Sequence, residues 1–62
     1  MNYEVIKYTS KGKYFMAGQL SKSRAYDMCI NFMEVDRQEH NTGITYKVIN
    51  ADTHKVVYEV SI

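Results

Sequence analysis

The chain has 62 residues with one cysteine, no proline and a formal net charge of +1. This length allows one small domain, which buries only about 60% of the surface that its unfolded chain exposes. A single cysteine excludes an intramolecular disulfide, so association with another chain is the simplest supplement to so small a core. The nearly neutral charge argues against a strongly basic nucleic-acid binder.

The composition also indicates a compartment. A lone Cys29 among apolar residues is typical of a reducing environment, where cysteine behaves as a small hydrophobic residue. The first residues, Met1 to Val5, lack the basic start and the apolar run of a signal peptide, and no stretch approaches the roughly 20 apolar residues of a membrane span. We therefore expect a cytoplasmic protein that does not enter a membrane.

Two runs of strand-forming residues come first in the chain. Residues 3–8 and 13–20 flank a Thr-Ser-Lys-Gly segment, in which Gly12 can adopt the positive φ that a tight hairpin requires. The inward face is not defined, because apolar residues occur at both odd and even positions: Tyr3, Val5, Ile6, Tyr8, Tyr14, Phe15, Met16, Ala17 and Leu20. The pattern predicts a hairpin whose two faces are both at least partly covered.

A helix is predicted to follow, from about Ser21 to Val35. Ser21 is a suitable N-cap, because its hydroxyl can accept a hydrogen bond from an otherwise unpaired amide. The core-facing stripe has the spacing i, i+3, i+4, i+7 and contains Ala25, Met28, Cys29 and Phe32. Asp36 would fall on the same stripe, so the regular helix is expected to end near Val35, before a loop over residues 39–43.

The apolar arc of this helix is wide, roughly 220° against about 100° for an ordinary surface helix. Tyr26 and Ile30 lie at one edge of the arc, and with Met33 they would form an exposed apolar ridge of the kind that marks an interaction surface. Alternatively, the twisted sheet and the loop over residues 36–43 wrap around these side chains. The sequence supports both arrangements.

The last third of the chain shows the clearest strand pattern. β-Branched and aromatic residues alternate with polar ones over residues 44–48 and 56–62, and the segment 50–54 contains Asn and Asp, which favour turns. This predicts a second hairpin. Val56, Tyr58, Val60 and Ile62 are expected to share one face of it.

Together these elements predict a single α+β domain over residues 1–62 with the order ββαββ. One helix packs on one face of a four-stranded sheet. The sheet is either wholly antiparallel or mixed, because the sequence does not fix which strands are neighbours. In each arrangement the second face of the sheet is open to solvent or to a partner.

No residue pattern points to catalysis or to a metal. The chain has no glycine-rich phosphate loop, no nucleophile elbow and no HExxH motif. Cys29 with His40 and His54 is one conceivable nucleophile and base, but a thiol on a buried stripe is normally inert. The same residues with Asp36 or Glu39 lack the paired spacings of a zinc site. We expect no enzymatic activity, no metal and no cofactor.

Lysine and tyrosine side chains interleave along the strands. The candidate contacts to nucleic acid or a small ligand are Lys7, Lys11, Lys13, Tyr14 and Lys47. They combine ammonium groups that pair with phosphate and rings that stack on bases, so binding of single-stranded nucleic acid along a sheet face is an alternative function. The nearly neutral charge makes the counterion-release contribution small. A further alternative is a small ligand such as a nucleotide, held between subunits.

Protein–protein interaction is the favoured function. Six tyrosines and four methionines suit it, because both residue types are enriched at interfaces. Residues 1–24 carry five basic side chains against one acidic, and residues 25–40 carry one basic against four acidic. Such a dipole can steer association. We expect a homo-oligomer, with a dimer favoured, that also has a possible protein partner.

In its length and its lack of any catalytic signature, the chain resembles the short accessory proteins that bacteriophages and plasmids encode to bind and redirect host enzymes. The resemblance extends to no defined motif. It implies an inhibitor or an adaptor of a partner protein rather than a catalyst.

Overall fold

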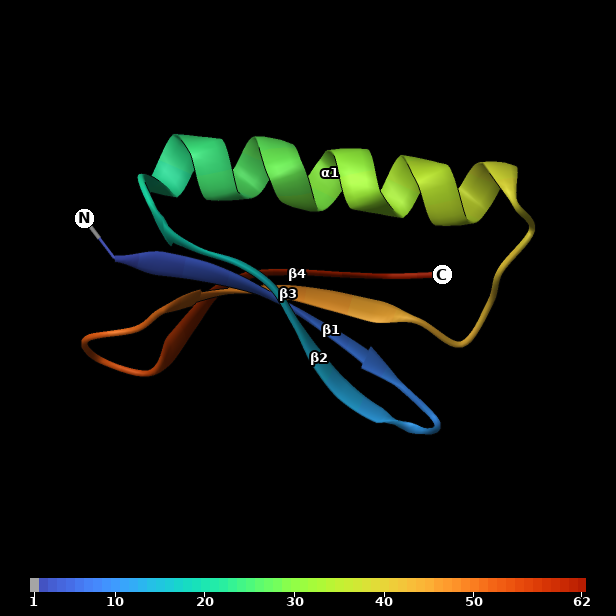
Figure 1. Cartoon of the computed structure of the whole chain (residues 1–62), viewed down its shortest axis with the longest axis horizontal. Helices are drawn as coiled ribbons and strands as arrows, with labels where there is room; N and C mark the ends of the chain where they lie inside the picture. The colour runs from blue at the N-terminus through green and yellow to red at the C-terminus, as the bar shows by residue number, and fades with distance from the viewer. Residues whose placement is uncertain (1) are drawn as a thin grey trace.

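The computed structural model describes residues 2–62. Its five elements are two hairpins on either side of one helix (Figure 1): β1 (Tyr3–Thr9), β2 (Gly12–Leu20), α1 (Lys22–Gln38), β3 (Thr45–Asn50) and β4 (Lys55–Ser61). The protein therefore has the α+β fold and the ββαββ order that the sequence predicts.

The four strands form one sheet in the order β2-β1-β3-β4, and every neighbouring pair is antiparallel. The pairing of β1 with β3 decides between the arrangements that the sequence leaves open, in favour of the wholly antiparallel sheet. Figure 1 shows α1 lying along one face of this sheet. Within residues 2–62, no element covers the opposite face, which we call the open face.

The first hairpin closes through the expected glycine turn. Gly12 has a φ of +140°, and the backbone amide of Lys11 donates a hydrogen bond of 3.1 Å to Oγ1 of Thr9. In β2, Met16 is an extra residue, because Val5 pairs with Ala17 whereas the next residue of β1 pairs with Phe15. This irregularity helps to explain why the alternation of β2 did not define its inward face.

The helix begins as predicted but continues three residues beyond its expected end. Oγ of Ser21 accepts a hydrogen bond of 3.2 Å from the backbone amide of Arg24, so Ser21 is the N-cap. The predicted end near Val35 was wrong, because the buried stripe includes Asp36, whose carboxylate receives hydrogen bonds in the core. A charged residue on the apolar stripe is therefore compatible with the helix here.

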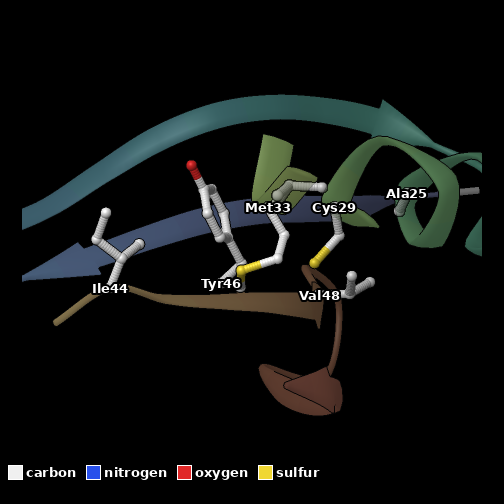
Figure 2. Packing of buried hydrophobic residues seen from close by; sticks show 7 residues of the cluster. Ala25, Cys29, Met33, Ile44, Tyr46 and Val48 are labelled. Carbon is white, nitrogen blue, oxygen red and sulfur yellow. The ribbon is translucent and has the colours of Figure 1, made fainter. Parts of the chain in front are cut away.

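The core lies between α1 and the two central strands. Its buried apolar residues come from β1, α1 and the segment 44–48 (Figure 2): Val5, Ala25, Cys29, Met33, Ile44, Tyr46 and Val48. Figure 2 shows the side chains of Cys29 and Met33 directed from the helix toward the strand that carries Tyr46 and Val48. The ring of Phe32 stacks on that of Tyr46 at a centroid distance of 6.0 Å and completes this layer.

A bulge in β4 corrects the expected face of Val56. Tyr58 pairs with Val48 and Val56 with Ile49, so Val57 is the extra residue between them. Val48 is buried under the helix, whereas Ile49 lies on the opposite face. Tyr58, Val60 and Ile62 pack against the core as predicted, but Val56 lies on the open face. A strict period of two cannot reveal an inserted residue.

Candidate functional site

Asp36 is the one buried charged residue in the described part of the chain, with 5% of its surface exposed. The Tyr46 hydroxyl donates to its Oδ2, Nδ2 of Asn41 donates to its Oδ1 over 2.9 Å, and Nζ of Lys7 lies 3.6 Å from Oδ2. Burial by itself raises the pKa of Asp36, but these hydrogen bonds and the ammonium outweigh it, so the pKa is lowered. The carboxylate is therefore ionised and fully partnered, which suits a structural role better than proton transfer.

The conceivable catalytic or metal-binding residues do not come together. Cys29 is fully buried, and burial raises the pKa of its thiol, which makes the reactive thiolate scarce. His40 and His54 are exposed in separate turns, the first after α1 and the second between β3 and β4. The part of the chain that the structure describes contains no group of three or more potential ligands placed to hold a metal ion.

The predicted ridge of Tyr26, Ile30 and Met33 does not exist as one exposed surface. Met33 is only 1% exposed and belongs to the core, so its placement on an exposed ridge was wrong. Tyr26 is 44% exposed, and its ring packs edge to face on Tyr58 of β4 at a centroid distance of 4.6 Å. Ile30 is half-buried. The twisted sheet thus covers most of this edge of the helix, which is the alternative that the sequence left open.

The candidate lysine and tyrosine contacts divide between two faces of the sheet. Lys7, Lys11 and Tyr14 line a cavity of about 580 Å³ on the helix side, which we call the hairpin cavity. Lys13 and Lys47 lie on the open face, where Nζ of Lys47 is 4.7 Å from the ring centroid of Tyr8. These five residues therefore do not form the single nucleic-acid-binding face that the sequence suggested.

The open face has an apolar centre that the sequence analysis did not identify as a site. A shallow hollow of about 370 Å³ is lined there by Ile6, Tyr8, Phe15 and Ile49, among others. Phe15 is the most exposed large apolar side chain, at 63%. A methyl group at Gly18 would lie 2.6 Å from Cζ of Phe15, so the ring rests directly on the backbone of its own strand. The signal for this surface in the sequence was the presence of apolar residues at both odd and even positions of β1 and β2.

Charged residues of both signs surround this apolar centre. Nζ of Lys47 lies 3.7 Å from Oε1 of Glu59, so these two charges neutralise each other. Glu4 and Lys13 lie at opposite ends of the face, because Glu4 is near the start of β1 and Lys13 pairs with Tyr8 near its end. Along β1 the open face is thus acidic at one end and basic at the other, with Ile6 between the two ends and the Lys47–Glu59 ion pair beside Ile6 on β3 and β4.

The open face and the hairpin cavity each combine exposed aromatic rings with charged groups. A further hollow at the start of α1 has one exposed ring, Tyr26, between Lys22 and Asp27. In the same residues, no helix has the length and the apolar character needed to cross a membrane. Comparisons of the chain with protein-family models, with curated proteins and with solved structures found no match.

Proposed function

We propose that this protein is a small non-enzymatic interaction module that works in the cytoplasm and forms a homodimer through the open face. In this proposal the dimer acts on a partner protein as an inhibitor or an adaptor. The observation that carries the proposal is the exposed apolar surface of the open face, above all Phe15 in β2 and Val56 in β4, which are 63% and 46% exposed. Large side chains of this kind on an unpartnered sheet face favour burial against another surface.

The occupant that fits this face best is a second copy of the chain. In a twofold symmetric interface, each residue i that contacts j of the partner is matched by a contact of j with i. Glu4 and Lys13 lie at opposite ends of the open face. Two copies whose twofold axis lies between the two open faces and runs across the strands bring Glu4 of one protomer toward Lys13 of the other, twice. Lys47 pairs with Ile6, midway between these ends, so it lies near its own copy at the axis, where its ion pair with Glu59 offsets the repulsion.

The size of the face limits the strength of the dimer. Four strands spaced about 4.8 Å apart and about seven residues long give a planar area of roughly 400 Å² on one face. A standard interface buries about 800 Å² per partner, so the open face is at the small end of specific interfaces. We therefore expect a dissociation constant in the micromolar range or weaker, and an exchange between monomer and dimer that depends on concentration.

Sedimentation equilibrium of the purified protein over a wide concentration range tests this proposal. The wild type is expected to shift from monomer to dimer, and Phe15→Lys to remain monomeric because a charge replaces the most exposed apolar ring of the open face. Tyr14→Lys is the matched control, since Tyr14 is the adjacent exposed aromatic residue of β2 but lines the helix-side cavity. It is expected to dimerise like the wild type.

A charge exchange tests the twofold arrangement. Glu4→Lys is expected to weaken the dimer, and combining it with Lys13→Glu to restore it, because the opposite charges meet again. A wild type that stays monomeric throughout the range contradicts the proposal. If Phe15→Lys still dimerises while Tyr26→Asp does not, the interface lies on the helix and the open face is the wrong surface.

A further inference from the structure

We propose that the hairpin cavity binds a small phosphorylated aromatic compound of the mononucleotide class. This site is independent of the proposed dimer, because it lies on the helix side of the sheet. Figure 1 shows the tip of the β1–β2 hairpin and the loop after α1 at the same end of the molecule. The cavity lies between these two segments, and its walls come from the hairpin, from residues 41–43 and from Ile44.

The volume and the floor of the cavity suit a small organic ligand. Its volume of about 580 Å³ falls within the range of roughly 300–1,000 Å³ that is usual for small-molecule sites. Met16 and Ile44 supply an apolar floor, and both belong to or pack against the core. The floor is therefore formed by side chains that the fold already holds in place.

The charge of the lining favours an anion. Lys7 and Lys11 contribute two ammonium groups, and the described residues that line the cavity include no carboxylate. Asp36 lies behind the lining, 3.6 Å from Nζ of Lys7, and both neutralises and positions this lysine. Lys11 is exposed in the turn and supplies the uncompensated charge. Ser10 and Thr42 add hydroxyl groups that can donate to phosphate oxygens.

An aromatic ring on the ligand is indicated by Tyr14. This side chain is 47% exposed although it lines the cavity, so its ring is available to a ligand. Tyr14 pairs with Lys7 across the hairpin, and Lys11 lies in the turn next to it. A phosphate held near Lys11 and a base stacked on Tyr14 would therefore be served by neighbouring side chains, as in other sites that bind nucleotides by stacking.

Titration of the isotope-labelled protein with adenosine 5′-monophosphate, followed by NMR, tests the proposal. Saturable shifts are expected at the amides of residues 7–16 and 41–44. Lys11→Glu and Tyr14→Ala are each expected to weaken binding by about tenfold, or 1.4 kcal/mol. Both residues are exposed, so the fold is expected to persist. Lys13→Glu and Phe15→Ala are the matched controls, because they change the same hairpin on the open face.

Three ligand controls define the chemistry. Adenosine and inorganic phosphate are each expected to bind at least about tenfold more weakly than the mononucleotide. Phosphate that binds as well as the nucleotide overturns the proposal, because the ring then contributes nothing. A single-stranded oligonucleotide that binds much more tightly than the mononucleotide also overturns it, in favour of a nucleic-acid site. So does the absence of saturable shifts at millimolar nucleotide, or an equal effect of Lys11→Glu and Lys13→Glu.

Discussion

The carboxylate of Asp36 lies between the helix and the sheet, where both of its oxygens accept hydrogen bonds. These bonds join three separate parts of the chain, since Asp36 belongs to α1, Tyr46 to β3 and Asn41 to the loop between them. Burial and the neighbouring carboxylate raise the pKa of Tyr46, so its hydroxyl remains a donor over the whole neutral range. The hydrogen bonds among Asp36, Asn41 and Tyr46 therefore hold the C-terminal end of the helix in position on the sheet.

Removing the hydroxyl of Tyr46 is expected to destabilise the protein. Tyr46→Phe keeps the ring but leaves the buried carboxylate with one donor fewer, which costs about 1–3 kcal/mol for a hydrogen bond to a charged group. Urea unfolding at neutral pH measures this difference. Tyr14→Phe removes an exposed hydroxyl and serves as the control, with a change expected within about 0.5 kcal/mol. An equal effect of both changes would show that the buried bond contributes nothing.

The lowered pKa of Asp36 predicts a loss of stability in acid. Its pKa is lower in the folded protein than the value of about 3.9 in an unfolded chain, so the unfolded state binds the proton first. The stabilisation is complete above that unfolded value and is lost as the pH falls through the folded one. Unfolding free energies of the wild type and of Asp36→Asn, measured between about pH 6 and pH 3, are expected to converge. Parallel curves would contradict this role of Asp36.

The helix is the element that the sequence predicts best, because its N-cap and its apolar periodicity are local signals. Its end was misjudged for a reason that is not local. Whether a carboxylate can lie on the buried stripe depends on Tyr46, ten residues further along the chain, and on Lys7 in the first strand. A tyrosine and a lysine at inward positions of two neighbouring strands could have suggested this pairing, but only once the strand order was known.

Capping of the helix provides a test at this scale. Ser21→Ala removes the hydroxyl that accepts from the amide of Arg24, and the expected loss is about 1 kcal/mol of unfolding free energy. Asn31→Ala changes an exposed residue in the middle of α1, where alanine has the better helix propensity, so no loss is expected there. Thermal unfolding by circular dichroism compares the two variants. A loss of the same size in Asn31→Ala would contradict the capping role of Ser21.

The strands show where periodicity stops being informative. The alternation in residues 44–48 is confirmed, since Ile44, Tyr46 and Val48 are all buried. In β4 and β2 an inserted residue changes the phase, which moves Val56 away from the face of Tyr58. The same limit applies to the candidate sites. The sequence gives no reason to separate Lys11 from Lys13 as candidate contacts. Only the structure shows that Lys11 lines the hairpin cavity and that Lys13 lies on the open face.

At the scale of the whole molecule, the fold is one helix on one sheet, with a radius of gyration of 11.0 Å. The ordinary radius for a compact chain of this length is about 10.5 Å, so the protein is only slightly more extended. It has a single layer of buried side chains, between the helix and the sheet, and the open face contributes little to this layer. The order of the strands in the sheet could not be predicted from the sequence, because the alternation of apolar and polar residues does not show which strands are neighbours.

Self-association is expected to change the apparent stability of the molecule. If only folded chains dimerise, mass action raises the unfolding temperature as the protein concentration increases. Scanning calorimetry of the wild type over a range of concentrations measures this shift. Phe15→Lys is expected to unfold at a temperature that does not depend on concentration. A wild type with a constant unfolding temperature would argue against a dimer that forms in this range.

The single thiol of Cys29 lies fully buried between the helix and the sheet, at the centre of the molecule. A reagent that modifies thiols can reach it only when the helix and the sheet separate, so the modification rate reports how often that separation occurs. The rate of thiol modification at Cys29 is therefore a direct measure of opening at the helix–sheet contact on which the fold depends. If binding of a ligand or of a second chain holds the helix and the sheet together, the modification rate of Cys29 falls. This can be measured without adding any label to the protein.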